Sequence, residues 1–265
     1  MSSNPHLPVR RQAVALMYHA LSQGMTPPGQ DPHYTLDEAR FRAQLRQIAA
    51  TGGGACARDW LADAADERVL LTFDDGHVSN HRIAFPALVE HDMHADFFVN
   101  PGNVGRPGYA SWQDLREMSG AGMSIQSHGH DHVYLTTLDT RTLRDRLRAA
   151  RQRIEDGVGA PVTLLAPPGG RMPVNLGAIA RDCGYRHVLS SRPGRIADGE
   201  HAYVLPRMSV TAAIDERRFA AWIGGDTAAI AREQFRYGAL ALAKRVLGDA
   251  RYERMRAHAL PGGGG

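Results

Sequence analysis

The stretch VLLTFDDGHVSN (residues 69–80) places an apolar run directly before two adjacent carboxylates, Asp74 and Asp75, and a glycine. Short, nearly continuous apolar runs bounded by polar residues are typical of strands that are buried on both faces of a sheet. Two like charges at the end of a strand repel each other, and a nearby cation would offset that repulsion. The stretch therefore predicts a central strand that ends at a cation-binding position.

Similar apolar runs recur along the chain, and helical patterns separate them. These runs are AVALMY (13–18), ADFFV (95–99), MSIQS (123–127), VTLLA (162–166), HVLSS (187–191) and YVLP (203–206). Strands that alternate with helices predict a parallel sheet covered by helices. We expect an α/β fold, a barrel of about seven parallel strands, with an open doubly wound sheet as the alternative.

Helix signals and domain limits follow from the same scan. Thr35 with Glu38 three residues later is a capping-box pattern, which predicts a helix that begins at Thr35. We expect a long helix over residues 138–158. The barrel is assigned to residues 1–225, and residues 226–265 to a C-terminal helical extension with a flexible glycine-rich end.

Composition fits a globular protein with one large core. The chain has 265 residues, of which 43% are hydrophobic, and a formal net charge of +3, which indicates no nucleic-acid partner. No uncharged apolar run is long enough to cross a membrane, and the first residues lack the pattern of a secretory signal. The two cysteines, Cys56 and Cys183, are far apart and fit reduced thiols. We expect a cytoplasmic protein, with peripheral contact to the inner membrane face compatible with its basic surface.

Polar residues directly follow several of the predicted strands: His19, Asp74, Asp75, Asn100, His128 and His132. In parallel α/β folds these strand ends converge on one rim, where the chemistry takes place. Two histidines and a carboxylate are the ligand types of a catalytic zinc site with an open coordination position. His128 and His132 would share a helix face, but Gly129 and the preceding strand favour a tight loop, with His130 facing away.

Each of these features has an ordinary structural explanation when taken alone. A single histidine at a strand end is a ligand in roughly one case in ten, and Asp-Asp-Gly is usually a turn. Two such clusters, both at strand ends and separated by two α/β units, rarely coincide by chance. The combined pattern therefore favours a metal site.

The motifs TFDDG (72–76) and SHGHDH (127–132) together resemble the NodB homology domain of the polysaccharide deacetylases, carbohydrate esterase family four. ADFFVN and LLAPPGG (164–170) resemble the family's next strand and its proline-rich third motif. The resemblance implies a distorted (β/α) barrel. It also implies that Asp74 is the general base and that Asp75, His128 and His132 bind a divalent metal. Zinc is the default metal, and cobalt, nickel or iron would also fit.

The chain departs from the family pattern at two places. The third motif has Ala166 where the family has an arginine that orients the base, and Gly169 where an aromatic residue often stands. The Gly169 N–H still offers the oxyanion donor that the family uses. No Leu-x-His near the C-terminus supplies a general acid, but LMYHAL (16–21) is similar to the opening of the branch containing poly-N-acetylglucosamine deacetylases. That branch makes His19 the acid, with Arg171 or Arg207 as candidates for the missing arginine.

The resemblance implies a hydrolase that removes an N-acetyl group from an amino sugar in a saccharide or glycolipid. Two alternatives remain open from the sequence. One is an enzyme of the same fold that hydrolyses another C–N bond, in a cyclic amide or a formamide. The other is a non-catalytic carbohydrate-binding relative, which Ala166 makes conceivable. The predicted base and all three predicted ligands are present, which counts against the latter.

Overall fold

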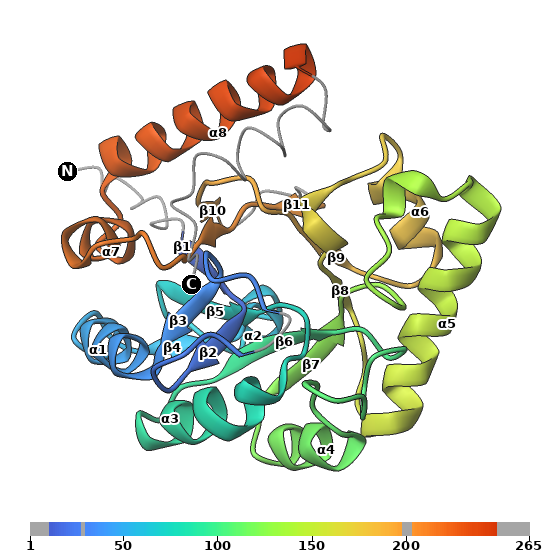
Figure 1. The fold of residues 1–265 in the computed structure, drawn as a ribbon, viewed down its shortest axis with the longest axis horizontal. Coiled ribbons are helices and arrows are strands. Elements are labelled where there is room, and N and C mark those ends of the chain that lie inside the picture. Colours follow the sequence, from blue (N-terminus) through green and yellow to red (C-terminus); the bar gives the residue numbers. More distant parts are fainter. Residues whose placement is uncertain (1–10, 28–29, 198–202, 248–265) are drawn as a thin grey trace, which may run out of the picture.

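The computed structural model describes residues 11–27, 30–197 and 203–247 (Figure 1). Residues 1–10 of the N-terminal segment, which lacks the pattern of a secretory signal, lie outside the described residues. The glycine-rich end lies outside them as well. No helix among the described residues combines the length and apolar character needed to span a membrane.

A barrel of parallel strands forms the centre of the molecule (Figure 1). Its parallel strands, in spatial order, are β1 (Gln12–Tyr18), β5 (Val69–Phe73), β6 (Ala95–Val99), β7 (Ser124–Ser127), β8 (Leu164–Leu165), β9 (His187–Leu189) and β11 (Val204–Leu205). Directly after β11, β12 (Met208–Ser209) pairs in parallel with β1, so the segment from β11 to β12 joins the two sides of the barrel. The predicted (β/α) barrel is confirmed.

The remaining short strands extend this sheet or lie beside it. β4 (Gly54–Ala55) pairs with β5, and β10 (Ile196–Ala197) pairs antiparallel with the start of β1. β2 (Ala20–Ser22) and β3 (Thr35–Asp37) form a separate two-stranded sheet.

Helices surround the barrel. They are α1 (Glu38–Ala49), α2 (Ala57–Leu61), α3 (Phe85–Glu90), α4 (Trp112–Gly120), α5 (Thr140–Val158), α6 (Leu176–Asp182), α7 (Glu216–Ile223) and α8 (Thr227–Leu247). The expected long helix over residues 138–158 is α5, which Asp139 caps and Gly159 ends in a left-handed conformation.

The predicted helix start at Thr35 is wrong. Thr35 pairs with Ala20 in the small sheet, so its backbone is extended and cannot enter a helix. Asp37 takes the N-cap position of α1 instead, and its carboxylate accepts a hydrogen bond from the Ala39 N–H at 2.9 Å. The strand pairing therefore overrides the capping pattern and moves the helix start along the chain.

Successive residues of the barrel strands face two different apolar cores. On β1, Val14 and Leu16 belong to the larger core, whereas Ala13 and Ala15 belong to a smaller one. The smaller core contains Ala166, which is fully buried. Small side chains on alternate positions leave room inside a narrow barrel, as this core requires.

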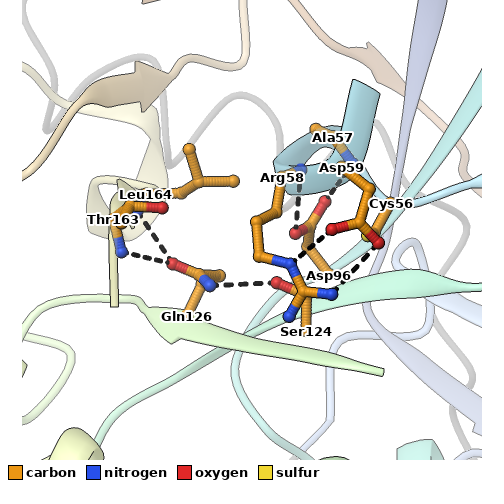
Figure 2. A network of polar contacts seen from close by, with 9 residues as sticks. All are labelled: Cys56, Ala57, Arg58, Asp59, Asp96, Ser124, Gln126, Thr163 and Leu164. Carbon is orange, nitrogen blue, oxygen red and sulfur yellow. Dashed lines mark hydrogen bonds and ion pairs between the residues drawn. The ribbon is translucent and has the colours of Figure 1, made fainter. Parts of the chain in front are cut away.

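A buried polar network crosses the smaller core (Figure 2). The Asp96 carboxylate on β6 accepts hydrogen bonds from the N–H groups of Ala57 and Arg58, at the start of α2. On the neighbouring strand, Gln126 contacts Ser124 at 2.9 Å and accepts the N–H of Leu164 at 2.8 Å. Ser124 also hydrogen-bonds to Asp96, so the network links α2, β6, β7 and β8.

Burial raises the pKa of Asp96 to about 6, against the opposing effects of the Ser124 hydroxyl and the Ala57 N–H. Because the folded-state pKa lies above the unfolded one, folding favours the protonated carboxyl. The resulting stability is complete below about pH 4 and is lost as the pH rises through about 6.

We expect the free energy of unfolding to fall by about 3 kcal/mol between pH 4 and pH 8, relative to an Asp96→Asn variant that cannot titrate. Urea unfolding of both proteins across this range, with chelator present, measures the difference. Curves that stay parallel would show that Asp96 does not titrate in this window.

Candidate active site

The first of the predicted motifs turns sharply at the end of β5. The Asp74 N–H donates to the Tyr18 carbonyl at 2.9 Å, so Asp74 still follows the sheet. Asp75 then adopts a φ of 74° and Gly76 a φ of 69°. A Cβ on Gly76 would lie 3.0 Å from a methyl carbon of Val99, so a glycine fits this turn best. The left-handed turn separates the two carboxylates and directs them to different partners.

The second motif forms a loop after β7, as its glycine predicts. The His128 N–H donates to the Val99 carbonyl at 2.8 Å, and the Asn100 amide donates to the His128 carbonyl. His130 contributes its carbonyl, which accepts from the Gly102 N–H at 2.8 Å. His132 adopts a φ of 60°, an uncommon conformation for a residue with a side chain, and such strain is concentrated at functional sites.

Together, the two loops bring three potential metal ligands to one point. Asp75 Oδ1 lies 3.2 Å from Nε2 of His128 and 3.2 Å from Nε2 of His132. The three atoms lie within 4.8 Å of one another. Asp75 Oδ1 is buried, yet it accepts no well-aligned hydrogen bond from a described residue. Two imidazoles and one carboxylate that converge without bonding each other fit a divalent metal with an open coordination position.

The charge state of Asp75 agrees with this fit. Burial alone would raise its pKa, but the nearby His128 and His132 hold the pKa of Asp75 well below its ordinary value. A ligand carboxylate has to be ionised, so this environment prepares Asp75 to bind a cation.

Asp74 turns to the other side and forms a buried ion pair. Its two oxygens accept hydrogen bonds from Nη1 and Nη2 of Arg207 at 2.7 and 2.8 Å. Arg207 is only 1% exposed, and it also donates to Thr72 Oγ1 and to the Ser190 carbonyl, both at 3.1 Å. Its guanidinium lies over the Phe98 ring. Each guanidinium nitrogen of Arg207 therefore donates a hydrogen bond. These bonds offset the cost of burying the two charges of the ion pair.

Arg207 also sets the ionisation of Asp74. Although burial raises the pKa, Arg207 and His128 hold the pKa of Asp74 below its ordinary value. Of the two arginines that the sequence left open, Arg207 contacts the predicted base. Arg171 instead stacks on the Tyr134 ring, at 4.5 Å from its centroid.

His19 lies at the end of β1, on the rim of the same cavity as Asp74 and Asp75. Its ring packs 4.6 Å from the Tyr34 ring, and its Nδ1 is buried without a hydrogen-bond partner among the described residues. Burial lowers the pKa of His19, an effect that the charges of Asp75 and Asp74 oppose. The structure therefore places the predicted acid beside the predicted base and ligands.

The proline-rich loop after β8 contributes Gly169, which has a φ of 61°. A Cβ at this position would lie 2.5 Å from Cε1 of Tyr134. The Tyr134 ring, from the loop after β7, therefore occupies the space beside Gly169 and leaves no room for a larger side chain there. Gly169 lines the cavity, and its N–H donates no hydrogen bond to a described backbone carbonyl.

These residues line one cavity of about 430 Å³, which we call the catalytic cavity. It also includes residues that the sequence analysis did not single out for this site: Gln30, Asp31, Tyr34, Tyr109, Tyr134 and Ser191. Most belong to loops between elements, where no periodic signal marks them. Tyr134, two residues after the second motif, was the one nearest to a recognisable pattern.

Comparison with known proteins gives consistent matches. The family model for polysaccharide deacetylase matches residues 62–188. YxkH of Bacillus subtilis (strain 168), which is named as a polysaccharide deacetylase, is 26% identical over 215 residues, covering 78% of this chain and 75% of that protein.

Solved structures agree with these matches. IcaB from Ammonifex degensii is 26% identical, with a TM-score of 0.67 over 80% of this chain and 97% of that one. A polysaccharide deacetylase from Bacillus cereus has a TM-score of 0.73 at 22% identity, over 81% of this chain and 69% of that one, and supports the fold alone. The resemblance that the motifs indicated is therefore confirmed.

Proposed function

We propose that the chain is a metal-dependent hydrolase that removes the N-acetyl group of an amino sugar, a proposal supported by the match of residues 62–188 to the polysaccharide deacetylase family model. The observation that carries the proposal is the pairing of two sites on one cavity. Three convergent ligands, Asp75, His128 and His132, lie beside Asp74, a carboxylate kept ionised by Arg207. Amide hydrolysis needs both an electrophilic cation and a base, and the cavity offers a place for each.

A divalent metal bound by Asp75, His128 and His132 would act as a Lewis acid and lower the pKa of water. Asp74 would accept the proton of the attacking water, since it lines the cavity and Arg207 fixes the position of its oxygens. The Gly169 N–H would donate a hydrogen bond to the acetyl oxygen as negative charge develops there.

His19 would protonate the departing amine, which leaves poorly as an anion. It follows the carboxyl end of β1, on the same rim as the ligand loop, and lines the same cavity as Asp74. Burial lowers the pKa of His19, whereas the charges of Asp75 and Asp74 favour the protonated imidazolium that this role requires. In this proposal the base is Asp74, which pairs with Arg207, and the acid is His19, which packs against Tyr34.

We expect His19→Ala to retain its metal and to lose about two to four orders of magnitude in turnover, the usual contribution of one proton donor. Acetate release and elemental analysis of the same preparation measure the two properties. Full turnover in His19→Ala would remove this histidine from the mechanism.

A substrate screen tests the proposed function. Acetate release is measured for N-acetylated amino-sugar oligomers of different linkage, beside a cyclic amide and a formamide. We expect hydrolysis of the amino sugars, its loss after chelation, and its recovery on addition of zinc or cobalt. Turnover of only the cyclic amide or the formamide would favour another C–N bond hydrolase with the same ligands. Saccharide binding without hydrolysis by the metal-loaded protein would favour a carbohydrate-binding protein.

A further inference from the structure

A second hollow continues from the catalytic cavity toward the C-terminal helix. It has a volume of about 610 Å³, and its wall beyond the catalytic cavity consists of Thr136, Met172, Ser209 and Tyr237. We call this region the outer groove. It shares Tyr34, Gly170 and Arg171 with the catalytic cavity, so a ligand can extend from one into the other.

Tyr237 comes from α8, the helix that the family resemblance does not explain. Figure 1 shows α8 beside the part of the barrel that contains β10 and β11. Ala229 and Ile230 bury part of α8 in the larger core, and polar contacts add to this packing. Arg218 of α7 donates to both carboxylate oxygens of Glu233, and the Gln234 amide donates to the Pro193 carbonyl at 3.3 Å. The position of Tyr237 is therefore fixed by its neighbours on the same helix.

The outer groove has the polar character of a site for a neutral, hydroxyl-rich ligand. No carboxylate lines its described part, and its one charged residue, Arg171, stacks on Tyr134. Thr136, Ser191 and Ser209, which carry hydroxyls, are among the residues that line the groove. Ser209 Oγ is buried and has no partner among the described residues, an arrangement that a bound hydroxyl would satisfy.

The aromatic ring at the end of the groove points to the same class of ligand. Tyr237 is 37% exposed, so its ring is partly available for contact. Tyrosine offers an apolar face and a polar tip, which suit a pyranose with its C–H face and its hydroxyls. The described lining of the groove holds one cation, Arg171, and no cluster of cations of the kind that binds phosphate tightly. The groove thus matches a sugar better than a charged linker.

We propose that the outer groove binds a second saccharide unit, adjacent in the glycan to the unit that is deacetylated, and that Tyr237 stacks on it. This inference rests on the proposed deacetylase function. It adds that the substrate is at least a disaccharide and that α8 is a specificity-determining wall of the site.

The experiment compares wild type, Tyr237→Ala, Tyr237→Phe and Phe235→Ala on mono- and trisaccharides of N-acetylglucosamine. Phe235 is the matched control, because it lies on the same helix, is 79% exposed and does not line the groove. Acetate release gives KM and kcat, and calorimetry gives trisaccharide binding independently of turnover.

We expect Tyr237→Ala to raise KM for the trisaccharide about tenfold with kcat unchanged, since one buried aromatic contact is lost. Monosaccharide kinetics should not change, Tyr237→Phe should retain most of the affinity, and Phe235→Ala should behave as wild type. An unchanged trisaccharide KM in Tyr237→Ala would overturn the inference, as would an equal loss in Phe235→Ala.

The two proposals can fail separately. Absence of acetate release from any amino sugar by the metal-loaded wild type would contradict the deacetylase function. Calorimetry would still compare trisaccharide binding in wild type and Tyr237→Ala, and equal affinity there would reject the outer groove as a saccharide site.

Discussion

Asp75→Ala is expected to lose its metal and, with it, at least about a thousandfold in deacetylase rate, because the Lewis acid contributes several kcal/mol to the barrier. Asp75 Oδ1 is the atom that both imidazole nitrogens approach, at 3.2 Å each. Without it, two histidines remain, one of them, His132, exposed at the cavity mouth. We expect elemental analysis to find about one divalent metal per chain in the wild type and close to none in the variant.

A measurement that does not depend on activity accompanies this result. Zinc should raise the melting temperature of the wild type by mass action, because only the folded chain presents the three ligands together. Asp75→Ala should show little shift. His130→Ala is the matched control, since His130 lies in the same loop, but its ring is directed to Asp131 at 4.0 Å rather than to the ligand cluster. Stoichiometric metal in Asp75→Ala would refute the assigned ligand set.

Arg207→Met is expected to lower the free energy of unfolding by about 3–5 kcal/mol, because it leaves the buried Asp74 carboxylate without its counter-ion. The rate of deacetylation should fall as well, since the pKa of Asp74 would rise and its oxygens would lose their fixed position. Urea unfolding measures the first effect, and acetate release at several pH values measures the second.

A double variant keeps this prediction testable if Arg207→Met folds poorly. Asp74→Asn combined with Arg207→Met removes both charges, and it should be more stable than Arg207→Met alone. The recovery should be partial, because Arg207 also donates to Thr72 and Ser190. Equal stability of the single and double variants would show that the ion pair is not what holds this part of the barrel. Asp74→Asn alone should retain metal while losing turnover.

The barrel and the approximate positions of the strand-end residues could be predicted from the sequence. Strands such as ADFFV and VLLTF have the same bounds in the structure because their apolar runs end at polar residues. Local patterns were less reliable where tertiary pairing competes with them, as at Thr35, which joins a strand. Side chains that reach the site from loops, such as Tyr34 and Tyr109, carry no periodic signal and could not be predicted.

The partner of Asp74 shows the same limit more clearly. The sequence left both Arg171 and Arg207 as candidates for the missing arginine. Arg207 directly precedes β12, and the parallel pairing of β12 with β1 brings Arg207 into contact with Asp74. β12 has two residues, which is too short for a strand to be recognised from its sequence. The choice between the two arginines depends on a contact between distant parts of the chain, which no local pattern contains.

That contact has a consequence for how the protein acquires activity as it folds. Leu16 pairs with Met208 and Met17 with Ser209, so the residue beside the base arrives with the pairing that joins the two ends of the barrel. Contacts between residues far apart in sequence carry the largest loop-closure cost and tend to form late. The ligand loops, in contrast, follow β5 and β7, which are separated by a single strand, β6, in both the chain and the sheet. We expect the nascent chain to bring its metal ligands together before Arg207 orients Asp74. Partly folded chains would then have no hydrolase activity until the barrel is complete.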